Sequence, residues 1–232
     1  MRTYHSLLIR YTGLKKESTV IQRLCLLFFF SIVGSCAAQP PHEAGPFQAN
    51  ELVELTKLDP TIRLDIWYAT THNFMGRVLY PQARAFLQRP AAEALVQVNA
   101  ELEPLGYRLL VFDGYRPWRI TKQMWDRTPA AKREFVADPR KGSRHNRGCA
   151  VDLSLCSLAT GQEVAMPGAY DEMSPRSYAA YAGGTPAQRE RRDLLRSKME
   201  AHGFTVLPAE WWHFDYKDWK AYPIQDVPFE KL

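Results

Sequence analysis

Two short segments of the chain bring together residue types that could hold a metal ion. One is SRHNRGCAVD, from Ser143 to Asp152, and the other is EWWH, from Glu210 to His213. Together they supply two histidines, an aspartate and a glutamate. A catalytic zinc ion usually has three protein ligands and keeps one position open for water. We therefore predict that His145, Asp152 and His213 are metal ligands.

The spacing of these residues places conditions on the local backbone. Gly148 would allow the tight turn that aims His145 and Asp152 at one point. On a regular strand, residues three apart such as Glu210 and His213 would face opposite sides. We therefore expect a bend or bulge near residues 208–211, which would place Glu210 beside the metal without binding it.

These residue types suit the hydrolysis of a peptide bond. Zinc lowers the pKa of bound water to about 7 and polarises a carbonyl group. A peptidase also needs a base that moves a proton from water to the leaving amine, and Glu210 could do this. Arg116, in the DGYRP segment, could stabilise the oxyanion.

Each of these residues, taken alone, also has a simpler interpretation. An isolated histidine is more often a core or surface residue, Arg116 could be a salt-bridge partner in a turn, and Glu210 could be a solvated loop residue. The two segments taken together are much more specific than either one.

Hydrophobic periodicity predicts the elements that would position these residues. Strands are expected at 62–68, 107–112, 150–155 and within 204–216. Helices are expected from Pro90 onward, ending at Gly106, over 120–125, and over 187–202 with Gly203 after the last turn. Strands and helices mix without a regular β-α-β alternation. This predicts an α+β fold, a single domain with a mainly antiparallel central sheet flanked by helices.

The first 38 residues resemble a signal peptide. Residues 24–33 form an uncharged apolar run of ten residues, too short for a bilayer span of about 20. The sequence Val33-Gly34-Ser35-Cys36 resembles a bacterial lipoprotein box, with cleavage before Cys36 and a lipid attached to it. Ordinary cleavage after Ala38 and a buried N-terminal helix are the alternatives.

This leader sets the expected organisation and location of the protein. We predict a signal peptide at 1–38, a tether at 39–50 and the catalytic domain at 51–232. The protein would be exported and periplasmic, with a membrane anchor at Cys36. Residues 1–35 hold five basic residues and one acidic residue, so the remainder has 25 basic and 24 acidic residues. The basic character thus belongs to the leader, and we expect no nucleic-acid partner and no obligate protein partner.

Two cysteines, Cys149 and Cys156, lie outside the leader and its cleavage site. The intervening residues alternate like a strand, which would separate the two by about 23 Å. A disulfide needs Cα atoms within about 7 Å. We therefore predict two free, buried thiols.

The ordered set of motifs resembles the D-alanyl-D-alanine dipeptidases of the vancomycin-resistance type. These belong to the zinc D,D-peptidases of peptidase family M15, a group that also resembles hedgehog domains. The resemblance covers about residues 58–222 and implies a hedgehog/D,D-peptidase-like zinc fold. Its motifs are YAT with NF at 68–74, DGYRP at 113–117, SRHNRGCAVDL at 143–153, DEM with RS at 171–177, and EWWHF at 210–214.

The resemblance implies a role for each matched residue. One zinc ion per chain would be bound by His145, Asp152 and His213. Glu210 would be the general base, and Arg116 would stabilise the oxyanion.

Three further matches concern the substrate. Asp171 and Tyr68 match positions that bind its free amine, Tyr68 through its backbone carbonyl. Ser143 matches a position that contacts its carboxylate. Two positions depart from the family pattern: Cys149, where a smaller residue is usual, and Tyr178, where a histidine is frequent and the pocket rim could change.

The function implied is zinc-dependent hydrolysis of D-Ala-D-Ala to two D-alanines, in cell-wall dipeptide turnover. One alternative is a zinc D,D-carboxypeptidase acting on peptidoglycan peptides, which would need an open site in place of Asp171. The other is a non-catalytic zinc-binding module, which would lack Glu210 or Arg116.

Overall fold

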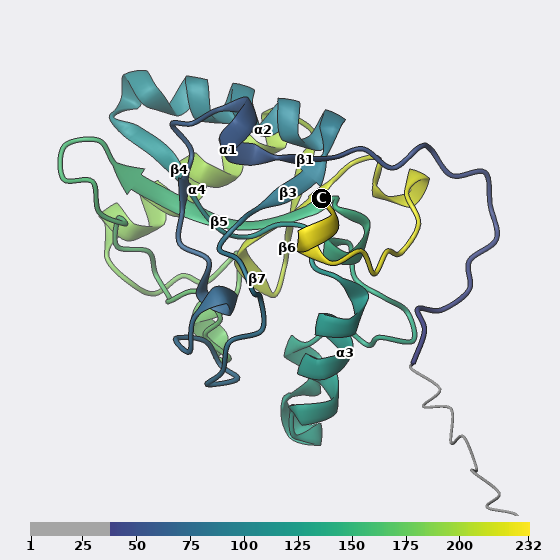
Figure 1. Ribbon diagram of the computed structural model, residues 1–232. Coiled ribbons are helices and arrows are strands. Elements are labelled where there is room, and N and C mark those ends of the chain that lie inside the picture. The colour runs from purple at the N-terminus through teal and green to yellow at the C-terminus, as the bar shows by residue number, and fades with distance from the viewer. Residues whose placement is uncertain (1–37) are drawn as a thin grey trace, which may run out of the picture. The chain divides into compact units, whose positions relative to one another are not determined.

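The computed structural model describes residues 38–232 (Figure 1). The predicted signal peptide up to residue 37, including the lipid site expected at Cys36, lies outside the described residues. Among residues 38–232, no helix has the length and apolar character needed to cross a membrane.

A five-stranded sheet forms the centre of the described chain, in the order β2-β4-β5-β7-β6. The β2–β4 pair is parallel and the other three pairs are antiparallel, which confirms the mainly antiparallel sheet. β1 and β3 form a separate antiparallel pair. The strands are β1 (Leu52–Glu54), β2 (Arg63–Leu64), β3 (Phe86–Gln88), β4 (Tyr107–Asp113), β5 (Ala150–Ser157), β6 (Phe204–Leu207) and β7 (Glu210–Tyr216).

The two longest helices pack on the sheet, and the others lie elsewhere. The two longest, α2 (Arg89–Leu102) and α4 (Pro186–Ala201), contact each other and pack on the sheet (Figure 1). α3 (Trp118–Arg127) lies apart from them, in the lower part of the view, and α1 (Leu55–Leu58) is a single turn. The described residues are therefore one α+β unit with flanking helices, as predicted.

Sequence features explain where the long helices begin and what they bury. Pro90 lies in the first turn of α2, where its missing N–H costs no hydrogen bond. The predicted apolar face of α2 is fully buried, in Ala91, Leu95, Val98 and Leu102. Side-chain and backbone hydrogen bonds between Thr185 and Gln188 cap the start of α4.

The ends of the helices depart from the prediction at one point. α2 stops at Leu102 and a 3₁₀ turn, Glu103–Leu105, separates it from Gly106, whose φ is +85°. Gly203 also has a φ of +85°, after α4. Glycine adopts this left-handed conformation at little cost, and both glycines therefore lead directly into a strand.

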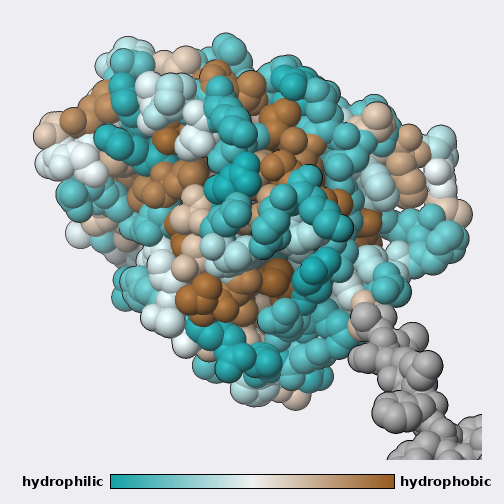
Figure 2. All heavy atoms as spheres, viewed as in Figure 1, coloured by the Kyte–Doolittle hydropathy of each residue, from teal (hydrophilic) through white to brown (hydrophobic). Residues whose placement is uncertain are grey.

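β5 is a central strand, and seven of its eight residues are buried. It lies between β4 and β7, with α4 in contact with it. Cys149 and Cys156 are free and buried, which confirms the prediction for both thiols. Hydrophilic residues cover most of the surface drawn in Figure 2, with hydrophobic residues between them in separate groups.

The strand expected at 62–68 is wrong for most of its length. Only Arg63 and Leu64 pair with β4, and the chain then turns into a 3₁₀ turn at Trp67–Ala69. Trp67 and Tyr68 pack against other rings there, with Tyr170 in contact with both. Aromatic packing therefore outweighs continuation of this edge strand.

The segment predicted to be a tether, residues 39–50, lies outside any helix or strand and contacts the body at several points. Glu43 forms an ion pair with Arg147 and accepts a hydrogen bond of 2.7 Å from the backbone N–H of Ile224. Gln48 donates its backbone N–H to Ala221, and Asn50 accepts from Gln88. Residues 39–50 are thus attached to the surface of the body, in part near Arg147.

Candidate active site

Three elements bring the predicted metal ligands together. Asp152 on β5 and His213 on β7 are directly paired across the two antiparallel strands, so their side chains lie on one face. His145 comes from a 3₁₀ turn, His145–Arg147, just before β5. Gly148 ends this turn with a φ of +69°, and a Cβ there would lie 2.4 Å from Leu52. The predicted role of Gly148 is confirmed.

The ligand atoms fit a small tetrahedral metal ion. His145 Nε2 lies 3.1 Å from His213 Nδ1 and 3.3 Å from Asp152 Oδ1, and the last two atoms are 3.0 Å apart. With zinc–ligand bonds of about 2.0–2.1 Å, ligand atoms of a tetrahedral site are about 3.3–3.4 Å apart. All three side chains are buried, so a metal ion would be held away from bulk water.

The remaining nitrogen atoms of the two histidines have partners of their own. His145 Nδ1 lies 2.7 Å from the carbonyl oxygen of Gly114, and His213 Nε2 lies 2.9 Å from Asp215 Oδ1. These acceptors would fix the hydrogen on the outer nitrogen and leave the inner lone pair free for a metal. Although burial alone would raise it, the two histidines hold the pKa of Asp152 well below its usual value. Asp152 is therefore ionised, as a ligand must be.

Glu210 lies beside the ligands because the pairing of β6 with β7 is irregular. Val206 pairs with Phe214, but the next residue, Leu207, pairs with Glu210. This irregularity confirms the predicted bulge and brings Glu210 Oε2 to 3.7 Å from His213 Nδ1. Burial raises the pKa of Glu210 above its usual value, which suits a group that accepts and then releases a proton.

Arg116 is held in the site by a carboxylate. Asp113 Oδ2, at the end of β4, accepts a hydrogen bond of 2.8 Å from Nε of Arg116 and forms an ion pair with its Nη2 at 2.6 Å. Arg116 Nη2 is 3.7 Å from Asp152 Oδ2, and its backbone N–H donates to the carbonyl of His145. The turn that carries Arg116 needs Gly114, because a Cβ there would lie 2.7 Å from the carbonyl oxygen of Phe86.

Asp171 and Tyr68 form a second polar group in the site. The Tyr68 hydroxyl donates a 2.8 Å hydrogen bond to Asp171 Oδ2. Asp171 has a φ of +58°, so its backbone is in a conformation that costs a non-glycine residue energy. Burial raises the pKa of Asp171 to about 7. Below that pH it is mainly neutral, and above it mainly charged.

The backbone carbonyl of Tyr68, for which a contact with the substrate amine is predicted, already has partners within the chain. Its backbone carbonyl accepts hydrogen bonds from the N–H groups of both Leu79 and Tyr80, at 2.8 and 2.9 Å. Both acceptor positions of that oxygen are therefore in use. The Tyr68 group that lies near Asp171 is the hydroxyl.

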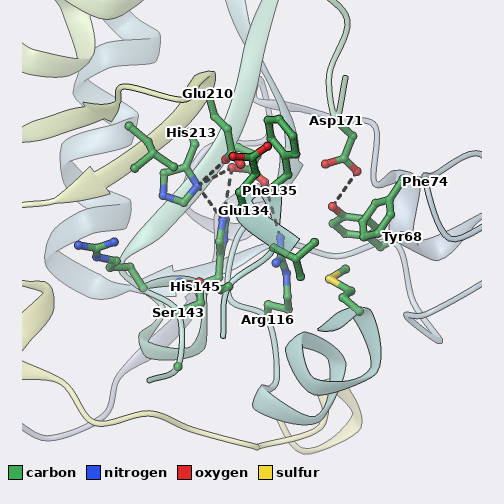
Figure 3. A pocket seen from close by; sticks show the side chains of 17 residues that line it. Tyr68, Phe74, Arg116, Glu134, Phe135, Ser143, His145, Asp171, Glu210 and His213 are labelled. Carbon is green, nitrogen blue, oxygen red and sulfur yellow. Dashed lines mark hydrogen bonds and ion pairs between the residues drawn. The ribbon is translucent and has the colours of Figure 1, made fainter. Parts of the chain in front are cut away.

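Figure 3 shows the arrangement of the site. Asp171 and Tyr68 lie on the right of the view, whereas Ser143, His145 and His213 lie toward its left. Ser143 is buried, and its hydroxyl accepts a 3.2 Å hydrogen bond from the backbone N–H of His145.

All eight residues predicted from the sequence line one cavity of about 210 Å³. This volume is below the range of about 300–1,000 Å³ that is typical of sites for larger ligands. Residues 134–137 also line the cavity. They comprise the last two residues of the 3₁₀ segment Ala130–Phe135 and the two residues that follow it. Tyr178, which departs from the family pattern, is 43% exposed and is not among the residues that line the cavity.

Several residues of the site were not predicted. Tyr170 donates a 3.2 Å hydrogen bond to Asp152 Oδ2, and Asp113 supports Arg116. Asp215 supports His213, and the signal for it was present, because residues two apart on a strand share a face. The position of Tyr170 depends on a loop and left no comparable signal.

The chain is similar to known proteins over most of its length. A family model described as D-ala-D-ala dipeptidase, within peptidase family M15, matches residues 48–231. The chain belongs to this family. The matched range contains all eight predicted site residues and begins after Glu43.

Individual relatives in this family match most of the chain. It is 34% identical over 174 residues to a D-alanyl-D-alanine dipeptidase of Escherichia coli (strain K12), covering 75% of this chain and 89% of that one. A protein of the same description from Enterococcus faecium is 35% identical over 183 residues, with 70% and 89% covered. One from Streptomyces coelicolor is 35% identical over 175 residues, with 68% and 87% covered.

Proposed function

We propose that this protein hydrolyses D-alanyl-D-alanine to two molecules of D-alanine with a zinc ion at His145, Asp152 and His213. The observation that carries the proposal is the arrangement of charges in one small cavity. Asp171, the proposed metal ligands and Ser143 all line this cavity, and Asp171 lies on the side of the view opposite His145 and His213 (Figure 3). A free dipeptide has an amine and a carboxylate at a fixed separation and matches this arrangement.

The side chains divide the reaction among themselves. When bound, zinc would polarise the substrate carbonyl and make a water molecule more acidic. Glu210 takes a proton from the attacking water and delivers it to the leaving amine. Arg116, held by Asp113, donates hydrogen bonds to the oxyanion that develops on the carbonyl oxygen.

The cavity also favours a dipeptidase over the two alternatives. A carboxypeptidase acting on wall peptides must admit a longer chain, whereas an acylated amine would leave Asp171 buried without a counter-charge. A binding module needs no base and no oxyanion partner. Glu210 and Arg116 are both present and both line the cavity.

The test compares free D-Ala-D-Ala with an N-acylated tripeptide that ends in D-Ala-D-Ala. Residues 38–232 contain the entire described core and form one compact unit, so protein without residues 1–37 is suitable. We expect cleavage of the free dipeptide alone, lost with a chelator and restored by zinc. Cleavage of the acylated peptide would make the protein a carboxypeptidase, and cleavage of neither would support a binding module.

We also propose that the protein is exported and anchored to a membrane by a lipid on Cys36. The apolar run at 24–33 and the lipoprotein-like sequence before Cys36 support this. An exported dipeptidase would degrade D-Ala-D-Ala released during wall turnover and free D-alanine as a nutrient.

Cell fractionation tests this location. We expect the protein in the membrane fraction of its host, and Cys36→Ala should move it to the soluble exported fraction or leave it unprocessed. Wild-type protein in the cytosol would refute the export proposal without affecting the proposed reaction.

A further inference from the structure

A carboxylate lies behind one metal ligand, on the side away from the ion. Asp215 is two residues after His213 on β7, so both side chains leave the strand on the same face. Asp215 Oδ1 is 2.9 Å from His213 Nε2, whereas His213 Nδ1 faces the other ligands. The Asp215 side chain is only 14% exposed. Water therefore has little access to compete with Asp215 Oδ1 for the hydrogen on His213 Nε2.

The second oxygen of this carboxylate faces an arginine from a different segment. Arg144 Nε lies 3.5 Å from Asp215 Oδ2. The Arg144 guanidinium stacks over the ring of Trp219, 4.7 Å from its centre. Stacking on an aromatic ring restricts the orientations of a guanidinium. Arg144 thus lies beside Asp215 as an ion-pair partner, without a hydrogen bond from its Nε.

These contacts connect two of the three ligand segments. Arg144 directly precedes His145, at the start of the 3₁₀ turn that carries this ligand. Asp215 belongs to the strand that carries His213. The ion pair therefore acts on the distance between the two histidines, while Asp215 also fixes which nitrogen of His213 has the hydrogen.

We propose that Asp215 and Arg144 are positioning residues that set the metal affinity of the site. Asp215 accepts the Nε2 hydrogen of His213 and leaves the Nδ1 lone pair directed at the ion. Arg144 orients Asp215 and joins the His145 turn to β7. This inference rests on the metal site of the proposed function, but not on the substrate.

The test is the zinc dissociation constant, measured by competition with a chromophoric chelator on protein without residues 1–37. Removing an acceptor behind a metal-binding histidine typically costs 10- to 100-fold in affinity. We expect a loss in this range for Asp215→Ala and a smaller loss for Asp215→Asn, whose amide oxygen still accepts the hydrogen. Asp218→Asn, which changes an exposed acid three residues further on, should leave the affinity unchanged.

A double variant tests whether Arg144 acts through Asp215. We expect Arg144→Ala to weaken zinc binding several-fold alone and to add nothing in the Asp215→Ala background. Additive losses would overturn the link between the two residues. An affinity of Asp215→Ala within about threefold of the wild type would overturn the role of Asp215.

Two readouts separate this inference from its alternatives. Unfolding of the metal-free variants shows whether a loss of affinity is a loss of fold; if Asp215→Ala does not fold, the isosteric Asp215→Asn decides the question. A wild-type protein that binds zinc but cleaves no D-Ala-D-Ala would refute the proposed function and leave this inference intact.

Discussion

At the scale of single residues, three carboxyl groups that line one cavity have different proton affinities. The pKa of Asp152 is held well below its usual value by the histidines, whereas burial raises the pKa of Glu210 and Asp171. Environments that separate the pKa values of neighbouring acids are how one site obtains both charged and proton-accepting groups. The proposed metal ligand Asp152, the proposed base Glu210 and the proposed amine-binding acid Asp171 therefore differ in their surroundings.

The role of Glu210 predicts the result of an isosteric substitution. Glu210→Gln removes the base but preserves the shape of the side chain, so kcat for D-Ala-D-Ala should fall by roughly 10²- to 10⁴-fold. The KM and the bound zinc should change little, because Glu210 lies beside the ligands without being one. Steady-state kinetics and metal analysis check this. Glu190→Gln, an exposed acid on α4, is the control, and a Glu210→Gln protein as active as this control would refute the role.

The pKa of Asp171, raised to about 7 by burial, predicts the pH dependence of substrate binding. The carboxyl is charged above this value, and the amine of a peptide keeps its proton up to about pH 8. The KM for D-Ala-D-Ala should therefore fall as the pH rises from 6 to about 7.5, and rise again above about 8. Initial rates across this range provide the measurement.

Asp171→Asn should raise the KM by roughly 10- to 100-fold, the size of a lost charged hydrogen bond. It should also abolish the fall in KM between pH 6 and 7.5. An unchanged pH profile in this variant would mean that another group binds the amine.

At the scale of elements, the most accurate predictions from the sequence concern elements whose apolar residues recur with a regular period. The helix α2 and the central strand β5 are examples, because the apolar residues that defined each pattern are buried in the core. Residues 62–68 were mispredicted because their alternation has a second explanation, the packing of Trp67 and Tyr68 among other rings. Pattern alone does not distinguish these cases.

The site shows the same division. Residues within matched motifs were predicted, down to the bulge that brings Glu210 to the ligands. Supporting residues were missed where they depend on contacts between distant segments. An example is Tyr170, which donates a hydrogen bond to the predicted ligand Asp152. The hydrogen bonds that the Tyr68 carbonyl accepts from Leu79 and Tyr80 likewise depend on the fold of a loop and were not predicted.

The N-terminal segment supplies a prediction about stability. Arg147 is buried in the turn of His145, and Glu43 provides its counter-charge from outside the range matched by the family. Glu43→Gln should lower the free energy of unfolding by about 2–3 kcal/mol, because a mostly buried guanidinium loses its partner. Urea denaturation of metal-free protein checks this.

The matched control for this prediction is Glu51→Gln. Glu51 pairs with Arg89 in solvent, with both side chains more than a third exposed, so its loss should cost less than about 1 kcal/mol. Equal effects of the two substitutions would mean that Glu43 is only a surface contact.

At the scale of the whole molecule, the metal site is built on two strands of the central sheet and on the turn before one of them. The ligands come from the turn before β5, from β5 and from β7, and α4 contacts both of these strands. The described chain has a large buried core apart from the site. We therefore expect the metal-free protein to remain folded, unlike small domains whose folding depends on zinc.

Metal binding should nevertheless raise the stability of the entire molecule, because only the folded chain brings the three ligand atoms within 3.0–3.3 Å. At a free zinc concentration 100 times the dissociation constant, the stabilisation is about 2.7 kcal/mol. For a domain of this size, that corresponds to a rise of roughly 5–11 °C in Tm. Thermal unfolding with zinc and with a chelator measures the shift, and His213→Ala should remove it. A wild-type Tm that is independent of zinc would show that the three buried side chains form a hydrogen-bonded cluster without binding a metal.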